Sequence, residues 1–156
     1  MKIRLLAVGH KMPKWVQQTF LDYNNRLPKA QQLELVEIAP IHRSKTINPQ
    51  VAMEKEAINI LAAIKPQETL IVLDEKGQAI STQYFADSIK KWQLQGTDVA
   101  LVVGGADGLT KELKNKAQQR WSLSGLTFPH PLVRVIIMEQ IYRAYSLIAN
   151  HPYHRE

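Results

Sequence analysis

The chain has 156 residues, of which 45% are hydrophobic, and a formal net charge of +6. This length is sufficient to bury a core, and we predict a single domain over residues 1–156. The sequence contains no cysteine, which excludes disulfides, thiolate metal sites and a cysteine nucleophile. No stretch approaches the roughly 20 apolar residues of a membrane span, and the first apolar run is too short for a signal peptide. We therefore expect a cytoplasmic protein with no membrane partner.

Strand and helix patterns alternate along the chain. Short apolar runs predict strands at residues 3–8, 33–38, 70–73 and 99–103. Prolines and capping side chains at segment starts predict helices that begin near Pro13, Pro49, Ser81, Thr110 and Pro131. Segment 121–128 is expected to be extended or irregular. The alternation predicts an α/β fold, with a mostly parallel sheet of about five strands and helices on both faces.

Ligands of parallel sheets bind beyond the carboxyl ends of the strands. This rule selects three places in the chain, which are the loops after Leu73 and Val103 and the segment near Phe128. The loop after Val103 reads Gly-Gly-Ala-Asp-Gly, and its glycines let a ligand approach the backbone closely. A tight structural turn explains the same glycines equally well. A dinucleotide-binding fingerprint is disfavoured, because the spacing is wrong and the loop does not follow the first strand.

Segment 121–131 mixes small, hydroxyl and apolar residues and ends in Pro-His-Pro. Such a segment can wrap a flat apolar group, for example an adenine ring, although an ordinary connecting loop is the alternative. His130 lies at the start of the last helix, where the helix dipole favours a neutral imidazole or a nearby anion. A lone histidine is more often structural than catalytic, so only its neighbouring loops make it a candidate site residue.

The last predicted helix carries a narrow polar stripe, Glu139, Arg143, Ser146 and Asn150, and is otherwise almost entirely apolar. So thin a stripe suggests a subunit interface in addition to the core, although a well-buried helix in a monomer is the alternative. Arg134 lies on the apolar side. A buried arginine needs an anionic or carbonyl partner, so we expect it to contact substrate or ligand, or to pair between subunits.

The chain ends with Tyr153, His154 and Arg155 before Glu156. These side chains can stack on a base, exchange a proton and hold a phosphate, which suits an RNA site. The net positive charge also favours a polyanionic partner. A simple terminal tail and a generally solvated basic surface remain open as alternatives.

Several segments together resemble the ribosomal large-subunit methyltransferase H family, a small branch of the SPOUT methyltransferases. They span nearly the whole chain and read VGHKMP (8–13), GGADGL (104–109), SGLTFPH (124–130), RV (134–135), EQIYRA (139–144) and YHR (153–155). The resemblance implies a deep trefoil knot in the C-terminal part of the α/β fold and S-adenosylmethionine as the cofactor, held in the knot. It further implies a homodimer without a metal. The implied reaction is methylation at N3 of a pseudouridine in 23S ribosomal RNA within the assembled ribosome.

The resemblance also implies which residues contact the cofactor. They are Leu73, Gly104, Gly105, Leu123, Ser124, Gly125, Leu126, Thr127 and Phe128. Many family members have Gly-Gly-Pro-Glu-Gly where this chain has Gly-Gly-Ala-Asp-Gly, so the outer glycines are kept.

Methyl transfer to an imide nitrogen needs alignment and removal of a proton. We hypothesise that His154 or His130 is the base, although solvent is an alternative. Arg155 and Arg134 would position phosphate or stabilise charge on the ring, and Tyr153 would stack on or orient the base. A shared basic face is expected to bind the RNA, with candidates Lys11, Lys14, Arg43 and Lys45. The rival functions are a non-catalytic basic RNA-binding module and, less favoured, a nicotinamide-dependent oxidoreductase.

Overall fold

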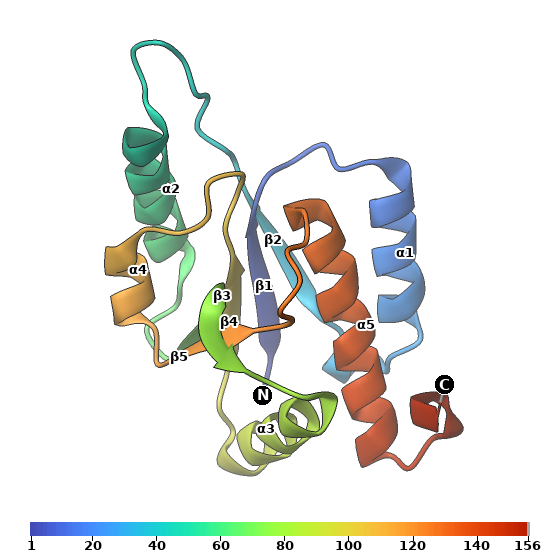
Figure 1. The fold of residues 1–156 in the computed structure, drawn as a ribbon. Coiled ribbons are helices and arrows are strands. Elements are labelled where there is room, and N and C mark those ends of the chain that lie inside the picture. Colours follow the sequence, from blue (N-terminus) through green and yellow to red (C-terminus); the bar gives the residue numbers. More distant parts are fainter. Residues whose placement is uncertain (156) are drawn as a thin grey trace.

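The computed structural model describes residues 1–155 and contains one five-stranded sheet in the order β2-β1-β4-β3-β5 (Figure 1). All four neighbouring strand pairs are parallel. The strands are β1 (Ile3–Val8), β2 (Glu34–Ile38), β3 (Thr69–Ala79), β4 (Val99–Val103) and β5 (Gln119–Ser122). The predicted parallel sheet of about five strands is therefore confirmed.

Helices cover both faces of the sheet, as predicted. They are α1 (Lys14–Asn25), α2 (Pro49–Ala63), α3 (Thr82–Gln95), α4 (Lys111–Lys116) and α5 (His130–Ile148), with short 3-10 turns η1 (Lys29–Gln31) and η2 (Pro152–Arg155). Helices α1, α3 and α5 share one hydrophobic cluster with the sheet, while α2 and α4 pack on the other face (Figure 1). This arrangement follows from the alternation of side chains along each strand, which sends successive residues to opposite layers.

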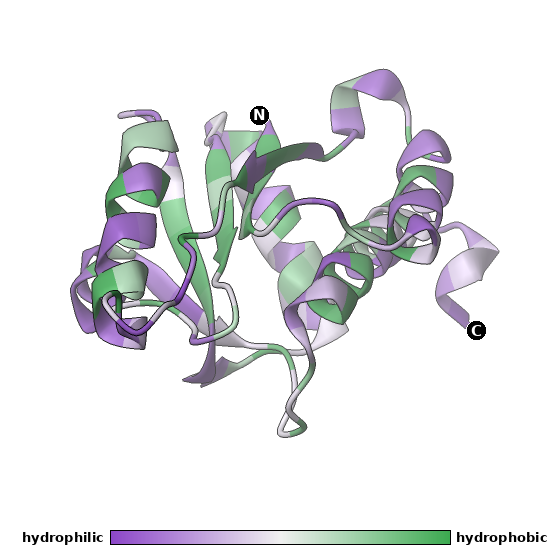
Figure 2. Cartoon of the chain, turned by 90° about the horizontal axis from the view of Figure 1, so that it is seen from above, coloured by the Kyte–Doolittle hydropathy of each residue, from purple (hydrophilic) through white to green (hydrophobic). Residues whose placement is uncertain are grey.

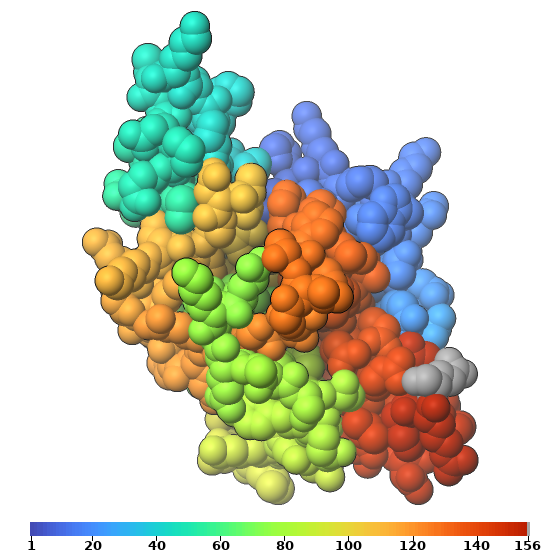
Figure 3. All heavy atoms as spheres, viewed as in Figure 1, coloured from blue at the N-terminus to red at the C-terminus, as the bar shows by residue number. Residues whose placement is uncertain are grey.

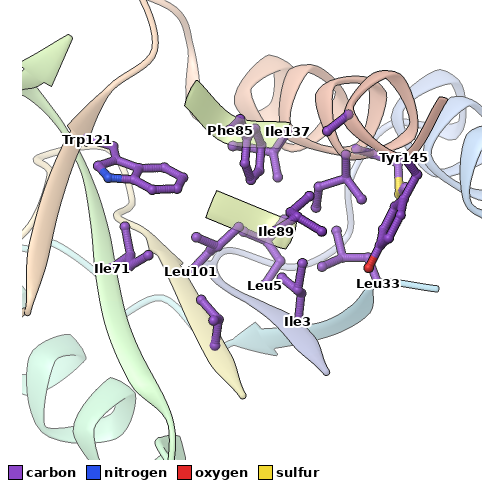
Figure 4. Close-up of a cluster of buried hydrophobic side chains, with 14 of the residues drawn as sticks. Ile3, Leu5, Leu33, Ile71, Phe85, Ile89, Leu101, Trp121, Ile137 and Tyr145 are labelled. Carbon is purple, nitrogen blue, oxygen red and sulfur yellow. The ribbon is translucent and has the colours of Figure 1, made fainter. Parts of the chain in front are cut away.

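The larger cluster includes Trp121, whose side chain is fully buried (Figure 4). Its ring centroid lies 5.3 Å from that of Phe85 and 5.9 Å from that of Trp92, on which it stacks. Leu5 and Leu101 are also fully buried in this cluster, and burial of each such side chain contributes about 1.5–3 kcal/mol. In Figure 2 the strands in the interior are mostly hydrophobic, whereas the outer helices include hydrophilic stretches.

Three helix starts have the caps that the sequence predicted. Asn48 Oδ1 accepts a hydrogen bond from Val51 N at 2.9 Å, and Ser81 Oγ accepts one from Tyr84 N at 3.0 Å. Thr110 caps α4 in the same way. These side chains satisfy backbone donors that have no partner inside the helix.

One strand is longer than predicted. The apolar run at 70–73 predicts only the buried first part of β3, which continues to Ala79 past an irregularity between Leu73 and Gln78. Its outer part is paired with β5, which begins at Gln119 and includes the first two residues of segment 121–128, predicted to be extended or irregular. None of the helices within residues 1–155 combines the length and apolarity needed to cross a membrane.

Candidate functional site

A cavity of about 630 Å³ opens at the carboxyl ends of the strands. Three segments line it, namely residues around Leu73 in β3, the loop after β4, and the connection between β5 and α5. In Figure 3 the green outer part of β3 and the orange connection lie beside each other on this side of the molecule. The three places selected by the strand-end rule thus meet around one cavity.

Most residues assigned to the cofactor by resemblance lie on the wall of this cavity. They are Leu73, Gly104, Gly105, Leu123, Ser124, Leu126, Thr127 and Phe128. Gly125 is exposed and does not line it. Leu126 keeps 71% of its surface exposed, so an apolar side chain stands at the mouth, where a ligand can cover it.

The glycine loop, defined here as residues 104–108, needs its glycines for its own turn. A Cβ at Gly104 would lie 2.7 Å from the carbonyl carbon of Gly108, and Gly108 itself has φ +79°. A Cβ at Gly105 would lie 3.0 Å from Val8 Cγ1. The tight turn that the sequence presented as an alternative to a ligand site is therefore present, and the same glycines line the cavity.

An ion pair that sequence reasoning missed also lines the cavity. Asp74 Oδ1 lies 3.4 Å from Lys114 Nζ, and the Asp74 side chain is only 10% exposed. Asp74 directly follows Leu73, so the strand-end rule could have selected it. Lys114 gave no comparable signal, because it comes from the far turn of a short helix.

His130 is the first residue of α5 and lies on the cavity wall, as predicted. Its Nδ1 is buried and has no hydrogen-bond partner within residues 1–155. Burial lowers the pKa of His130, and the nearby Arg134 cation lowers it further. The imidazole is therefore neutral at neutral pH and can accept a proton or a hydrogen bond.

Arg134 is 2% exposed and has a carboxylate and a carbonyl partner, both in its own chain, while its Nε is buried without a hydrogen-bond partner within residues 1–155. Its Nη1 donates to Glu37 Oε2 at 2.7 Å, and its Nη2 donates to the carbonyl oxygen of Gly9 at 2.9 Å. It lines a second cavity of about 480 Å³, beside α1 and β2, rather than the first. Arg134 thus fastens α5 to the end of β1 and to β2.

The last predicted site residues lie at the opposite end of α5, beyond the amino ends of the strands (Figure 1). The helix of 19 residues is roughly 28 Å long, and η2 folds back along its second half, where Tyr153 meets Tyr142 and Glu139. Tyr153 packs against Tyr142 at 4.6 Å between ring centroids, and its hydroxyl lies 3.0 Å from Glu139 Oε1. His154 Nδ1 is buried without a hydrogen-bond partner in the part of the chain described, while Arg155 is exposed.

The Tyr153 hydroxyl is suited to holding the chain end in place. Burial raises its pKa, and the hydrogen bonds with Tyr23 and Glu139 raise it further. It therefore remains protonated at neutral pH. Within one chain, the structure does not bring Tyr153, His154 and Arg155 together with His130 and the cavity.

A family model described as "Predicted SPOUT methyltransferase" matches residues 1–154. The chain belongs to the SPOUT methyltransferase family. Relatives named ribosomal RNA large subunit methyltransferase H, from Methylobacillus flagellatus and Hydrogenovibrio crunogenus, are 49% and 50% identical over 156 residues, with 100% of both chains covered in each case. A solved probable methylase family protein from Haemophilus influenzae matches with a TM-score of 0.56 and 13% identity, covering 97% of this chain and 69% of that one. This last likeness shows the fold alone.

The resemblance to the methyltransferase H branch of the SPOUT family is confirmed by these full-length relatives. The trefoil knot expected in the C-terminal part is implied by membership of the SPOUT family. Within residues 1–155, no three histidine, aspartate or glutamate side chains are grouped so as to hold a metal ion.

Proposed function

We propose that this SPOUT protein, as a single domain over residues 1–156, uses S-adenosylmethionine to methylate N3 of a pseudouridine in 23S ribosomal RNA of the assembled ribosome. The observation that carries the proposal is the cavity at the strand ends, because residues assigned to the cofactor by sequence resemblance line it together. The names of the full-length relatives support an RNA of the large ribosomal subunit as the substrate.

The residues at the cavity fit this cofactor. A volume of about 630 Å³ lies within the usual range for small-molecule sites, roughly 300–1,000 Å³. The absence of side chains at Gly104 and Gly105 leaves the backbone at the wall. Apolar Leu123 and Phe128 and the hydroxyls of Ser124 and Thr127 can bind the faces and edges of a nucleoside. When bound, S-adenosylmethionine supplies an electrophilic methyl group.

The side chains of this protein would align the target nitrogen, exclude water and manage one proton. An imide nitrogen becomes a good nucleophile only when its proton is removed. His130 is neutral and lies on the cavity wall, which favours it as the acceptor on the grounds of position. His154 is the other candidate, and it requires a second chain because of its place at the far end of α5.

We propose a homodimer in which the chain end of one subunit reaches the cavity of the other. The proposal is supported by the length of α5, which separates η2 from the cavity of its own chain. It is also supported by Trp15 and Leu21 on α1, which are 52% and 55% exposed. In such a dimer Arg155, Lys11, Lys14 and Lys45 would contribute to a shared basic face for the ribosome.

The decisive experiment measures binding of S-adenosylmethionine by calorimetry, together with methyl transfer to ribosomes that lack the modification. We expect cofactor binding and one methyl group per ribosome at a pseudouridine, identified by mass spectrometry of RNA fragments. RNA binding without cofactor binding would instead support the rival, a non-catalytic RNA-binding module.

The assignment of the base is tested by His130→Ala and His154→Ala in the same assay at saturating cofactor. Loss of turnover in only one variant identifies the residue that matters. Near-normal turnover in His154→Ala removes His154 from the mechanism, and near-normal turnover in both variants assigns the proton to solvent.

A further inference from the structure

The segment between β2 and α2, here called the arm (residues 39–48), forms a loop that projects beyond the start of α2 (Figure 1). At its base Arg43 joins two other parts of the chain. Its Nη1 and Nη2 donate to the two carboxylate oxygens of Glu56, at 2.6 and 3.1 Å. Its Nε donates to Asp107 Oδ2 at 2.9 Å. The guanidinium therefore bridges α2 and the glycine loop.

The bridge is anchored at the buried carboxylate of Glu56. The Glu56 side chain is only 3% exposed and also accepts a hydrogen bond from Ile41 N at 2.9 Å. Arg43 Nη1 in addition donates to the carbonyl oxygen of Ile41 at 2.7 Å. A planar guanidinium that binds a carboxylate through two nitrogens has a fixed orientation. The contacts with Glu56 and Ile41 thus fix the orientation of the Nε that donates to Asp107.

These contacts change the interpretation of Arg43. Together they use four of the five N–H donors of its side chain. The sequence placed Arg43 among the candidates for RNA contact, but its donors are directed into its own chain. The hydrogen bonds to Glu56 raise the pKa of Arg43 most, against the effect of burial.

The other end of the bridge is part of the cavity wall. Asp107 lies in the glycine loop, one residue before Gly108, and lines the cavity beside Gly104 and Gly105. The loop closes on itself through Gly108 N, which donates to the carbonyl oxygen of Gly105 at 3.1 Å. Arg43 adds a contact from outside the loop, between the loop and α2.

We propose that Arg43 is a positioning residue for the methyl donor, because it ties Asp107 to buried Glu56 and so holds the glycine loop in the shape that lines the cavity. The identity of the ligand rests on the proposed function. A loop that is already ordered loses less conformational freedom when its ligand binds, so affinity rises without any contact between Arg43 and the ligand. The Asp107 side chain is 36% exposed, which moderates the strength of the pair.

The test is a double-mutant cycle on cofactor affinity, measured by calorimetry with S-adenosylmethionine. We expect Asp107→Asn and Arg43→Met each to raise the Kd about three- to tenfold, in line with the loss of one partly exposed charged hydrogen bond. The double variant should bind no more weakly than Arg43→Met alone. Multiplied effects would mean that Asp107 contacts the ligand independently of Arg43, and would overturn the proposal.

Matched controls separate positioning from loss of folding. Glu54→Gln and Lys55→Met, both at exposed positions on α2, change charge in the same way as the two test variants, and both should leave the Kd unchanged. Arg43→Met leaves the Glu56 carboxylate buried without its cation, so Arg43→Met/Glu56→Gln is measured as well, with a melting curve for each protein. The double variant Arg43→Met/Glu56→Gln should weaken cofactor binding as much as Arg43→Met does, but should be more stable than Arg43→Met.

Kinetics on ribosomes supply the second readout. The KM for S-adenosylmethionine should rise in Asp107→Asn, while kcat at saturating cofactor stays within about twofold of wild type. A fall in kcat with unchanged KM, or unchanged affinity in all bridge variants, would refute the role of Arg43. If the wild-type protein itself fails to bind S-adenosylmethionine, the proposed function fails instead, so the two failures are distinguishable.

Discussion

The two ends of the parallel sheet use polar side chains in opposite ways. At the amino ends, Arg4 donates to both carboxylate oxygens of Glu68 at 2.7 and 2.6 Å, and the pair is buried. At the carboxyl ends, the glycine loop surrounds a cavity, and His130 Nδ1 is buried without a partner in residues 1–155. The Arg4–Glu68 pair therefore satisfies its charges internally, while His130 Nδ1 at the cavity has capacity left for a ligand. Substitutions in the Arg4–Glu68 pair should mainly change stability, and those in the glycine loop should mainly change binding.

The largest expected effect concerns the Arg4–Glu68 pair at the amino ends of the strands. Arg4→Met leaves the Glu68 carboxylate buried without a cation, which should lower the free energy of unfolding by about 3–5 kcal/mol, measured by urea denaturation. Arg4→Met/Glu68→Gln removes both charges and should recover much of this loss. The Kd of the folded protein for S-adenosylmethionine should not change. A weaker Kd in the folded variant would show that the two ends are coupled.

The second prediction concerns the chain end, which lies beyond the amino ends of the strands in its own subunit. A chain that stops at Pro152 should bind S-adenosylmethionine normally and lose methylation of ribosomes at least about 100-fold, as expected for removal of groups that act on the substrate. His154→Ala/Arg155→Ala keeps Tyr153 in its aromatic cluster and should show most of the same loss. If cofactor binding disappears as well, the chain end is structural and has no separate role in methyl transfer.

The third prediction concerns the glycine loop at the carboxyl ends of the strands. Gly104→Ala introduces a Cβ 2.7 Å from the carbonyl carbon of Gly108, so the loop must rearrange. We expect cofactor affinity to fall about tenfold or more. Gly96→Ala is the matched control, because Gly96 ends α3 with φ +64° and has open space around its Cβ position. It should cost about 1 kcal/mol of stability and leave affinity unchanged.

The smallest expected effect is a dependence of stability on pH. Burial, assisted by Arg134, lowers the pKa of His130 in the folded protein, so between this value and about 6.5 the unfolded chain binds more protons. The contribution of neutral His130 is complete above about pH 6.5 and declines as the pH falls below it. Urea denaturation at about pH 7 and pH 5.5 should therefore show a smaller loss for His130→Asn than for wild type. An equal loss in both proteins would mean that His130 is not responsible.

Local signals predicted most of the fold and the position of the cavity. Caps such as Asn48 and Ser81 act on backbone groups within three residues, so the sequence alone contains both partners. The strand-end rule brought the loops after Leu73 and Val103 together because it depends only on the direction of the strands. The outer part of β3 was not predicted, because it is polar and is defined by its pairing with β5.

Contacts between distant segments could not be predicted in this way. Arg43 was assigned to RNA by its charge alone, whereas its partners Glu56 and Asp107 come from another helix and another loop. Arg134 was correctly expected to need a carboxylate or a carbonyl, but Glu37 and Gly9 could not be identified without the fold. The sequence specifies what kind of partner such a side chain requires, and the packing determines which residue supplies it.

The position of Trp121 gives the protein an internal optical reporter. Its indole is fully buried, yet Trp121 also belongs to the cavity wall. Trp92 is stacked in the core beside it, whereas Trp15 is exposed on α1. We therefore expect short-wavelength fluorescence from Trp121 and Trp92, and iodide should quench only the long-wavelength component from Trp15. We expect a ligand in the cavity to change the emission of Trp121, so that its binding could be followed in the unmodified protein without a label or an enzymatic assay.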